Sequence, residues 1–133
     1  MGNVTAREMM GEVIGTFIMC FFGIGAVATV TLAGAHTGPF QVGMVWGLAI
    51  AIAIYCTRNL SRAHFNPAVT VAMAVTGRLE GKKVLSYLIG QFIGAFIAAL
   101  VLWIYFAASV NGIDANWASV AGPDTAASIW CEQ

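Results

Sequence analysis

The chain has 133 residues, of which 59% are hydrophobic and 9% are charged, and its mean hydropathy is +0.83. Soluble domains carry about 25% charged residues, so this composition excludes a soluble globular protein and indicates an integral membrane protein. The formal net charge is zero, and basic residues cluster only between Arg78 and Lys83, which gives no support for a nucleic-acid partner. Cys20, Cys56 and Cys131 show no C-x-x-C spacing, so we expect packing roles and no metal, cofactor or disulfide framework.

Long runs without charge mark the predicted membrane spans. No Asp, Glu, Lys or Arg occurs from Val13 to Thr57, and glycine and proline interrupt this run only at 34–39. A third charge-free run covers 84–113. The first apolar run is longer than a signal-peptide core of about 7 to 15 residues, so we expect it to be retained as a span. The predicted spans are about 8–33, 40–57 and 84–108.

The basic residues predict the orientation in the membrane. Arg7 precedes the first span, and every other Lys or Arg lies between the second and third spans. Cytoplasmic loops carry the excess of Lys and Arg, which places the N-terminus inside and the C-terminus outside, in the plasma (inner) membrane. Residues 109–133 would then be a polar extracytoplasmic tail or a truncated connecting loop, with Trp117 and Trp130 suited to the membrane interface.

The stretch from Ser61 to Thr70 predicts a short helix inside the membrane. Proline at the first helical position loses no needed N–H, so Asn66-Pro67 indicates a helix start. The apolar pattern ends at Gly77, which leaves a helix over about 67–76. Ten residues at about 1.5 Å each reach roughly 15 Å, half of a hydrocarbon core of about 30 Å. The segment therefore fits a re-entrant half-helix and is too short to span.

A helix start at mid-membrane has a functional interpretation. Such a start carries partial positive charge and free N–H donors, and backbone of this kind is tolerated only in protein or beside a water-filled cavity. The positive end and the Asn66 amide would act on whatever passes through a pore. A bare Asn-Pro is more often a capped surface loop, but the long apolar segments on both sides favour the pore.

Glu12 is the ionisable residue predicted to lie about one turn inside the first span. A carboxylate there is a functional or structural site by default. We expect it to accept hydrogen bonds from the irregular backbone around His64 to Asn66; the alternative is a carboxylate that reaches the interface. Each span also contains a G-x-x-x-G pair, which favours close helix packing. The pairs are Gly11 and Gly15, Gly43 and Gly47, and Gly90 and Gly94.

Several motifs in order resemble one family. His64 to Thr70, preceded by Gly11 to Thr16 and by Val45 to Ala49, is similar to the first half of an aquaporin (major intrinsic protein family), over about residues 8–108. The resemblance implies an all-α membrane fold: three transmembrane helices and one re-entrant half-helix make one of two inverted repeats. In that fold two Asn-Pro-Ala half-helices meet head to head, and four chains form a tetramer with one pore each.

The resemblance also implies roles for individual residues. Asn66 would be the first of two pore asparagines, and Glu12 would hold the loop that leads to it. Backbone carbonyls before Asn66 would line the cytoplasmic half of the pore. Ala63, His64 and Phe65 would offer these carbonyls, and Pro67 and Ala68 would also line the pore.

Trp46 matches the aromatic position of the outer selectivity filter in that family. Tryptophan there resembles glycerol facilitators and metalloid-acid channels, because an indole offers an apolar face to a carbon backbone, and Ile50 one turn on would share this face. By itself, a membrane tryptophan is more often an interfacial anchor. The family usually has glycine where this chain has Arg62, so we expect a changed turn there and a fixed charge near the cytoplasmic mouth.

These observations favour a passive channel for water and small uncharged solutes such as glycerol. The matched region is one repeat, so we expect the chain to be incomplete by itself and to need a second half-channel, with a homotetramer-like assembly in the bilayer. The alternative is a non-conducting membrane interaction protein, or a truncated one, that associates through its glycine faces. An enzyme is not expected, since no nucleophile and base recur on one face.

Overall fold

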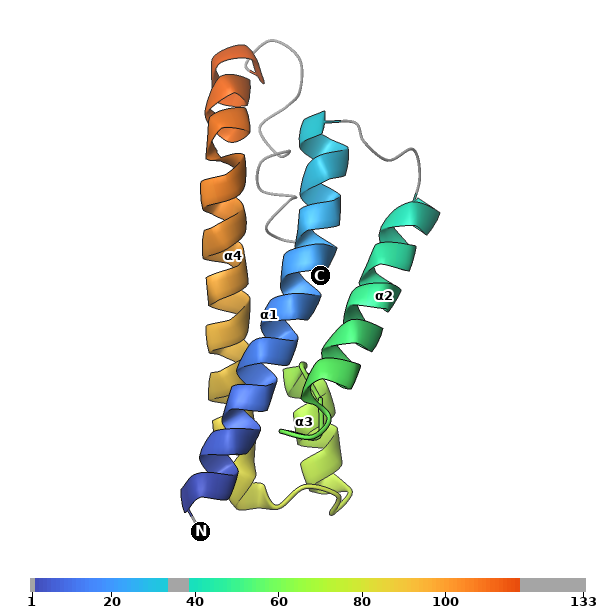
Figure 1. Ribbon diagram of the computed structural model, residues 1–133, viewed down its shortest axis with the longest axis vertical. Coiled ribbons are helices and arrows are strands. Elements are labelled where there is room, and N and C mark those ends of the chain that lie inside the picture. Colours follow the sequence, from blue (N-terminus) through green and yellow to red (C-terminus); the bar gives the residue numbers. More distant parts are fainter. Residues whose placement is uncertain (1, 34–38, 118–133) are drawn as a thin grey trace.

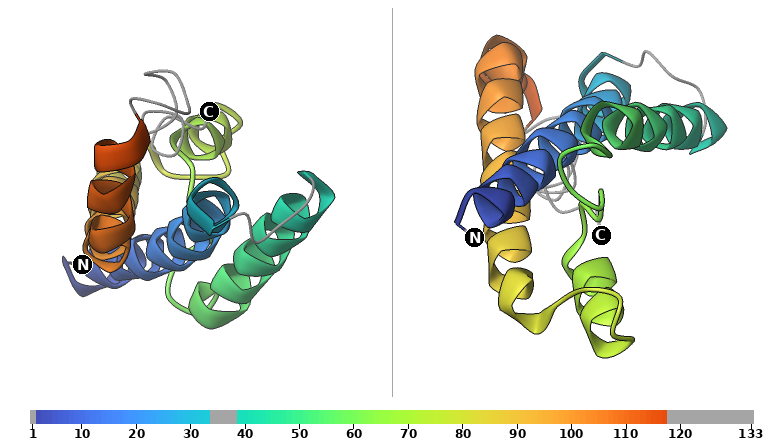
Figure 2. Two further views of the ribbon diagram at one scale, coloured as in Figure 1. Left: turned by 90° about the horizontal axis from the view of Figure 1, so that it is seen from above. Right: turned by 60° about the horizontal axis from the view of Figure 1, so that its bottom comes forward.

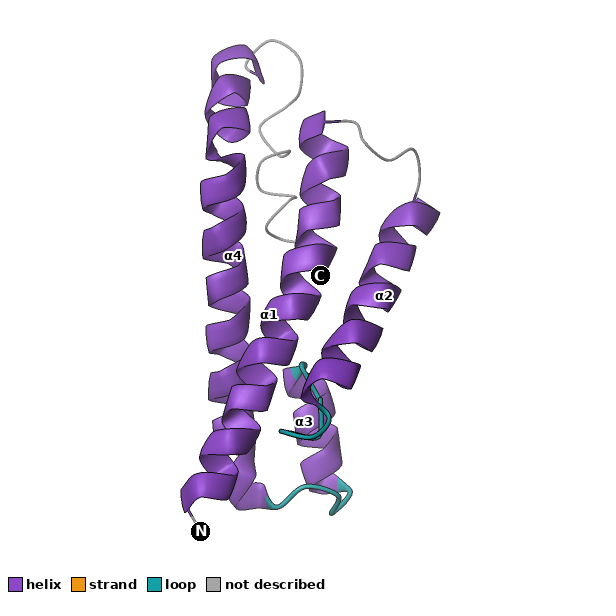
Figure 3. Ribbon diagram, in the orientation of Figure 1, coloured by secondary structure: helices purple, strands orange, loops and turns teal. Residues whose placement is uncertain are grey.

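The computed structural model describes residues 2–33 and 39–117, and this part of the chain is helical with no strand (Figure 3). Three helices are long and apolar enough to cross a membrane, over Ala6–Leu32, Pro39–Thr57 and Gly81–Ala107. The predicted fold class, all-α with three spans and a half-helix, is confirmed. The helices are α1 (Gly2–Ala33), α2 (Pro39–Thr57), α3 (Pro67–Val75) and α4 (Gly81–Trp117).

The three long helices run side by side and the short α3 lies beside one end of them (Figure 1). Helix α1 lies between the other two: it packs most extensively on α4 and less so on α2, whereas α3 packs on α4. The view from above shows the same order (Figure 2). With 9 residues, α3 is about 14 Å long, so it cannot cross the bundle. It starts partway along the bundle and runs back to the end where α1 begins (Figure 1).

Glycines set the close contact between α1 and α4. A Cβ added at Gly90 would lie 2.7 Å from the Met9 carbonyl oxygen, and one at Gly94 would overlap the Val13 carbonyl oxygen. Small residues let helix backbones approach closely in lipid, where burial of apolar surface drives little association. Gly43 and Gly47 differ, because a Cβ at either one would meet nothing within 4 Å. Their face of α2 is free in this structure.

The pattern of burial is that of a bundle surrounded by lipid. At the far end from α3, Ala28 packs with Leu102 and Phe106 in a small apolar core. Large apolar side chains point outward along the same helices, and Phe92 and Tyr105 are 76% and 77% exposed. In water such surfaces would favour aggregation, whereas in lipid they are the expected exterior.

Two helices extend beyond the predicted spans. Helix α1 begins at Gly2, and α4 runs from Gly81 to Trp117, so residues 109–117 are helical where a tail or loop was expected. The physical reason is that a loss of apolar character does not end a helix. The first proline after Ser109 is Pro123, and Gly112 alone only weakens a helix. Residues 34–38 and 118–133, with Trp130 and Cys131, lie outside the described residues.

Candidate functional site

The start of α3 is capped by Asn66. This residue has extended backbone (φ −148°, ψ 129°), and its Oδ1 accepts hydrogen bonds from the N–H groups of Ala68 at 2.8 Å and Val69 at 3.4 Å. Pro67 occupies the first helical position, where the missing N–H costs nothing. Because Oδ1 faces the helix, the Asn66 NH₂ group points away from it and is a donor beyond the helix end.

The loop before Asn66 has an unusual backbone. Ala63 and Phe65 adopt positive φ values of 54° and 51°, which side chains other than glycine rarely take. Arg62 does not share this conformation, so the turn does not need the glycine that the resemblance led us to expect at that position. A left-handed residue costs about 1 to 2 kcal/mol, so other contacts must hold the loop.

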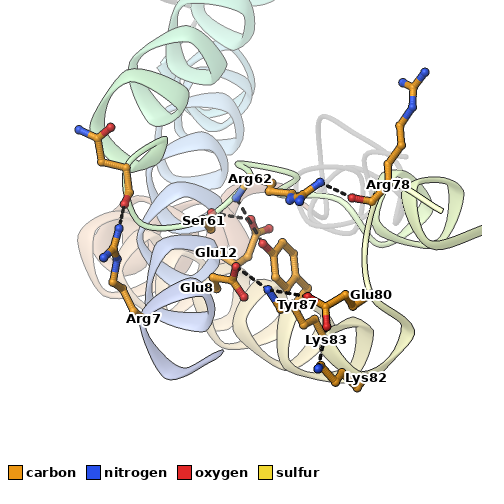
Figure 4. A network of polar contacts seen from close by, with 11 residues as sticks. Arg7, Glu8, Glu12, Ser61, Arg62, Arg78, Glu80, Lys82, Lys83 and Tyr87 are labelled. Atoms are coloured by element: carbon orange, nitrogen blue, oxygen red, sulfur yellow. Dashed lines mark hydrogen bonds and ion pairs between the residues drawn. The ribbon is translucent and has the colours of Figure 1, made fainter. Parts of the chain in front are cut away.

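Glu12 supplies those contacts. Its side chain is fully buried, and its Oε1 accepts hydrogen bonds from Ser61 Oγ at 2.7 Å and from the His64 N–H at 3.0 Å. Its Oε2 accepts from the Phe65 N–H at 2.8 Å and from Gln91 Nε2 at 2.8 Å. Figure 4 shows Glu12 beside Ser61. One carboxylate on α1 thus holds both the loop and α4.

These hydrogen bonds fix the direction of the loop carbonyls. No peptide bond in the described chain is cis, and a trans peptide points its C=O opposite to the N–H of the next residue. Since the N–H groups of His64 and Phe65 point at Glu12, the carbonyl groups of Ala63 and His64 point away from it. The loop therefore presents successive acceptors on the side opposite its buried anchor.

A second set of polar contacts surrounds this anchor. Gln91 Nε2 also donates to Thr70 Oγ1 at 2.9 Å, and His64 Nδ1 lies 3.2 Å from the same hydroxyl oxygen. The Thr70 hydroxyl is 3.1 Å from the Asn66 carbonyl oxygen. Sequence reasoning did not single out Ser61 or Thr70. The sequence did contain two signals for them. Ser61 places a hydroxyl at the start of the loop, and Thr70 places a second hydroxyl about one helical turn after Asn66.

The other predicted site residues lie on α2. Trp46 is half-buried and packs on α1 at Gly23, where an added Cβ would overlap the indole ring. Ile50, one turn on, is 38% exposed. Gly23 is needed here because the ring lies directly against the α1 backbone. The structure thus fixes the position of Trp46 through a glycine that sequence reasoning did not consider.

Basic residues gather at the end of the bundle where α1 and α4 begin (Figure 4). Lys83 Nζ binds Glu8 at 3.0 Å, and Lys82 Nζ binds Glu80 at 2.7 Å. The hydrogen bond from Lys82 lowers the pKa of Glu80. The guanidinium of Arg7 donates to the Asn59 carbonyl and that of Arg62 to the Arg78 carbonyl, while the Arg62 N–H donates to Tyr87 at 3.3 Å.

The described residues contain no group of His, Cys, Asp and Glu side chains that could hold a metal ion. They do contain a half-helix that starts partway along an apolar bundle (Figure 1) and a loop tied to a buried carboxylate. This arrangement defines a membrane protein built around a re-entrant segment. The chain belongs to the major intrinsic protein family, whose model matches residues 3–129.

Three known proteins are similar to this chain. The glycerol uptake facilitator protein of Haemophilus influenzae is 45% identical over 94 residues, covering 71% of this chain and 36% of that protein. The propanediol uptake facilitator of Salmonella typhimurium is 40% identical over 106 residues, covering 80% of this chain and 40% of that protein. The X-ray structure of the aquaglyceroporin from Plasmodium falciparum matches with a TM-score of 0.76 and 29% identity, over 82% of this chain and 45% of that one. The chain thus spans less than half the length of these relatives.

Proposed function

We propose that this chain forms the N-terminal half of a passive membrane channel for glycerol, water and other small uncharged solutes. The observation that carries the proposal is the loop that Glu12 holds. Its Ala63 and His64 carbonyls point away from the anchor and lead to the Asn66 amide at the start of α3. A row of acceptors followed by a donor suits a hydroxylated solute, which needs both.

The proposed selectivity has two physical sources. The positive end of the α3 dipole and the Asn66 amide disfavour cations and protons. The indole of Trp46 and the side chain of Ile50 offer an apolar surface to the carbon backbone of a polyol. The pore-lining set is Trp46, Ile50, Ala63, His64, Phe65, Asn66, Pro67 and Ala68, with Glu12 as the positioning residue for the loop.

The complete pore would need a second half-channel. One half-helix supplies one Asn66 and one dipole, whereas the family resemblance implies two half-helices head to head. The names of the relatives, glycerol and propanediol uptake facilitators, fit a small polyol as solute. We further propose a tetramer-like assembly in the inner membrane. The basic residues at one end of the bundle support a cytoplasmic N-terminus.

A test joins this chain to a known second half. In one polypeptide, this chain replaces the matching N-terminal part of the Haemophilus influenzae relative, and glycerol flux into proteoliposomes is measured by light scattering. We expect flux well above that of empty liposomes, and none from the 133-residue chain alone. Asn66→Ala should abolish the flux, whereas Asn59→Ala, at the exposed end of the preceding turn, should preserve it. A folded chimera without glycerol flux would contradict the proposal.

The free glycine face of α2 favours one alternative. A Cβ added at Gly43 or Gly47 would meet nothing within 4 Å in the described chain, so this face is open to another protein, which it could bind without conduction. In that case the chain would associate in membranes, and the chimera would not conduct.

A further inference from the structure

The contact between Trp46 and Gly23 is closer than a residue with a Cβ would allow. A Cβ added at Gly23 would lie 2.4 Å from the indole atoms Cδ2 and Cε2 and 2.5 Å from Cζ2. These atoms belong to the six-membered ring, and their nearly equal distances place the added carbon over the face of that ring. Carbon atoms in contact are about 3.5 to 4.0 Å apart, so an added Cβ would force the ring away from α1 by about 1 Å.

Helix α2 cannot easily relieve this overlap by moving as a whole. Its buried residues Ala49, Ala53 and Thr57 follow Trp46 at helical spacing along one face. Among the described helices α2 packs extensively on α1 alone, so this face is its contact with α1. Moving the helix would open that contact, whereas the Trp46 side chain is only half-buried and can move toward its exposed side. An added Cβ at Gly23 would therefore displace the ring and not the helix.

The exposed side of Trp46 is the side that the proposed function assigns to the solute. Ile50, one turn on and 38% exposed, belongs to the same surface. A displacement of about 1 Å is roughly a quarter of the contact distance between two carbon atoms. Such a change matters for the carbon chain of a polyol and less for the smaller water molecule.

We propose that Gly23 is a positioning residue that sets the width of the filter at Trp46, and with it the balance between glycerol and water. Because Gly23 has no side chain, the indole lies with its face against the α1 backbone and leaves room for a polyol. Gly23 is itself buried and does not touch the solute. The inference rests on the proposed function for the role of Trp46, whereas the contact between Gly23 and Trp46 is independent of that role.

The first test uses the single-chain chimera with the Haemophilus influenzae relative. Gly23→Ala should lower the ratio of glycerol to water permeability in proteoliposomes about tenfold, because overpacking a fitted passage raises the barrier by about one tenfold step in rate. The matched control is Gly25→Ala on the same helix. A Cβ there would lie 3.3 Å from Leu102 Cδ2, the end of a flexible side chain, so the ratio should not change.

A second background shows whether the effect passes through the indole. Trp46→Leu removes the ring and keeps an apolar side chain, so a methyl group at Gly23 has no ring to displace. Adding Gly23→Ala to Trp46→Leu should therefore leave the permeability ratio of Trp46→Leu unchanged. A residue that only supports the fold would lower the flux in both backgrounds.

Fluorescence of the full 133-residue chain reports the position of the ring without conduction. Replacing Trp103, Trp117 and Trp130 by Phe leaves Trp46 as the single tryptophan. In micelles of a brominated detergent, which quenches exposed indole rings, Gly23→Ala should increase the quenching of Trp46. Gly25→Ala should not.

The contrary outcomes separate this inference from the proposed function. An unchanged ratio in a folded, conducting Gly23→Ala chimera, or an equal loss in the Trp46→Leu background, would overturn the inference and leave the channel intact. If Gly23→Ala folds only together with Trp46→Leu, the overlap with the ring is confirmed, and failure to fold in both backgrounds would overturn it. A silent wild-type chimera would contradict the proposed function and the filter with it, and increased quenching would then show only that Gly23 holds the ring.

Discussion

Glu12 connects the three parts of the site at the scale of a single residue. Four donors from the loop and from α4 converge on one fully buried carboxylate, at distances between 2.7 and 3.0 Å. Charge-assisted hydrogen bonds of this kind are about twice as strong as neutral ones. They offset the cost of two positive φ values and of backbone inside the membrane. The loop has its conformation because α1 carries an acid at this position.

Glu12→Gln is the sharpest test of this role. Glutamine has the same shape but replaces one acceptor oxygen by an NH₂ donor, which would face two of the four donors. Losing hydrogen bonds to a charged group, and leaving buried donors without partners, should lower the free energy of unfolding by about 3 kcal/mol. The measurement is a sodium dodecyl sulfate titration of the purified chain in mixed micelles, followed by circular dichroism.

A matched control for this test is Glu80→Gln. Glu80 is exposed and bound to Lys82 at 2.7 Å, and the same chemical change there should leave stability unchanged. If the two variants had equal stability, Glu12 would not be the anchor of the loop.

Part of this site could be predicted from the sequence, because its signals are local. Asn66-Pro67 is a local signal, and a buried carboxylate must find donors, so a contact between Glu12 and the loop backbone could be expected. The positive φ values of Ala63 and Phe65 could not be predicted from the sequence, because neither alanine nor phenylalanine favours them. The contacts of Gln91 and the packing of Trp46 on Gly23 depend on how α1, α2 and α4 are rotated against each other, which no local pattern encodes.

At the scale of the helices, the contact between α1 and α4 supports the site. Gly94 lies against the α1 backbone at Val13, the residue after Glu12, so the helix separation fixes how far Gln91 can reach. On α2, a Cβ added at either glycine of the same G-x-x-x-G pattern would meet nothing within 4 Å. Identical motifs thus have different roles, and only the structure separates them.

This difference predicts contrasting results for two identical substitutions. Gly94→Ala adds a methyl group that overlaps the Val13 carbonyl, so α1 and α4 must move apart, at a cost of about 2 kcal/mol. Gly47→Ala adds the same methyl group in open space and improves helix propensity, so stability should rise by up to about 1 kcal/mol. Both are measured by detergent titration of the isolated chain. Equal losses for the two variants would show that α2 packs differently from the structure.

At the scale of the whole molecule, the bundle has one basic end. The starts of α1 and α4 and the ends of α2 and α3 lie together (Figure 1), and Lys83 with Glu8 and Arg62 with the Arg78 carbonyl join them there. The one-sided charge that the sequence displays is therefore also one-sided in space. Such a molecule should insert in a single orientation, with this end in the cytoplasm.

Cysteine labelling in intact cells tests this orientation. Cys131 lies outside the described residues but follows α4, whose far end is opposite the basic end, so a membrane-impermeant maleimide should label it from outside. The Cys131→Ser variant gives the background, which matters because Cys56 is exposed on α2. In that background, Lys82→Cys places an exposed thiol at the basic end, and it should react only after permeabilisation.

The orientation decides whether copies of this chain can form a pore together. Two copies inserted the same way would bring both α3 helices from the cytoplasmic side, so their positive ends would lie side by side and would not meet head to head. Labelling of Cys131 only after permeabilisation would reverse the orientation of every copy. If Cys131 and the thiol introduced by Lys82→Cys were both labelled from outside in comparable amounts, copies would insert both ways. Paired copies could then rebuild an inverted repeat, and flux from the chain alone would be expected.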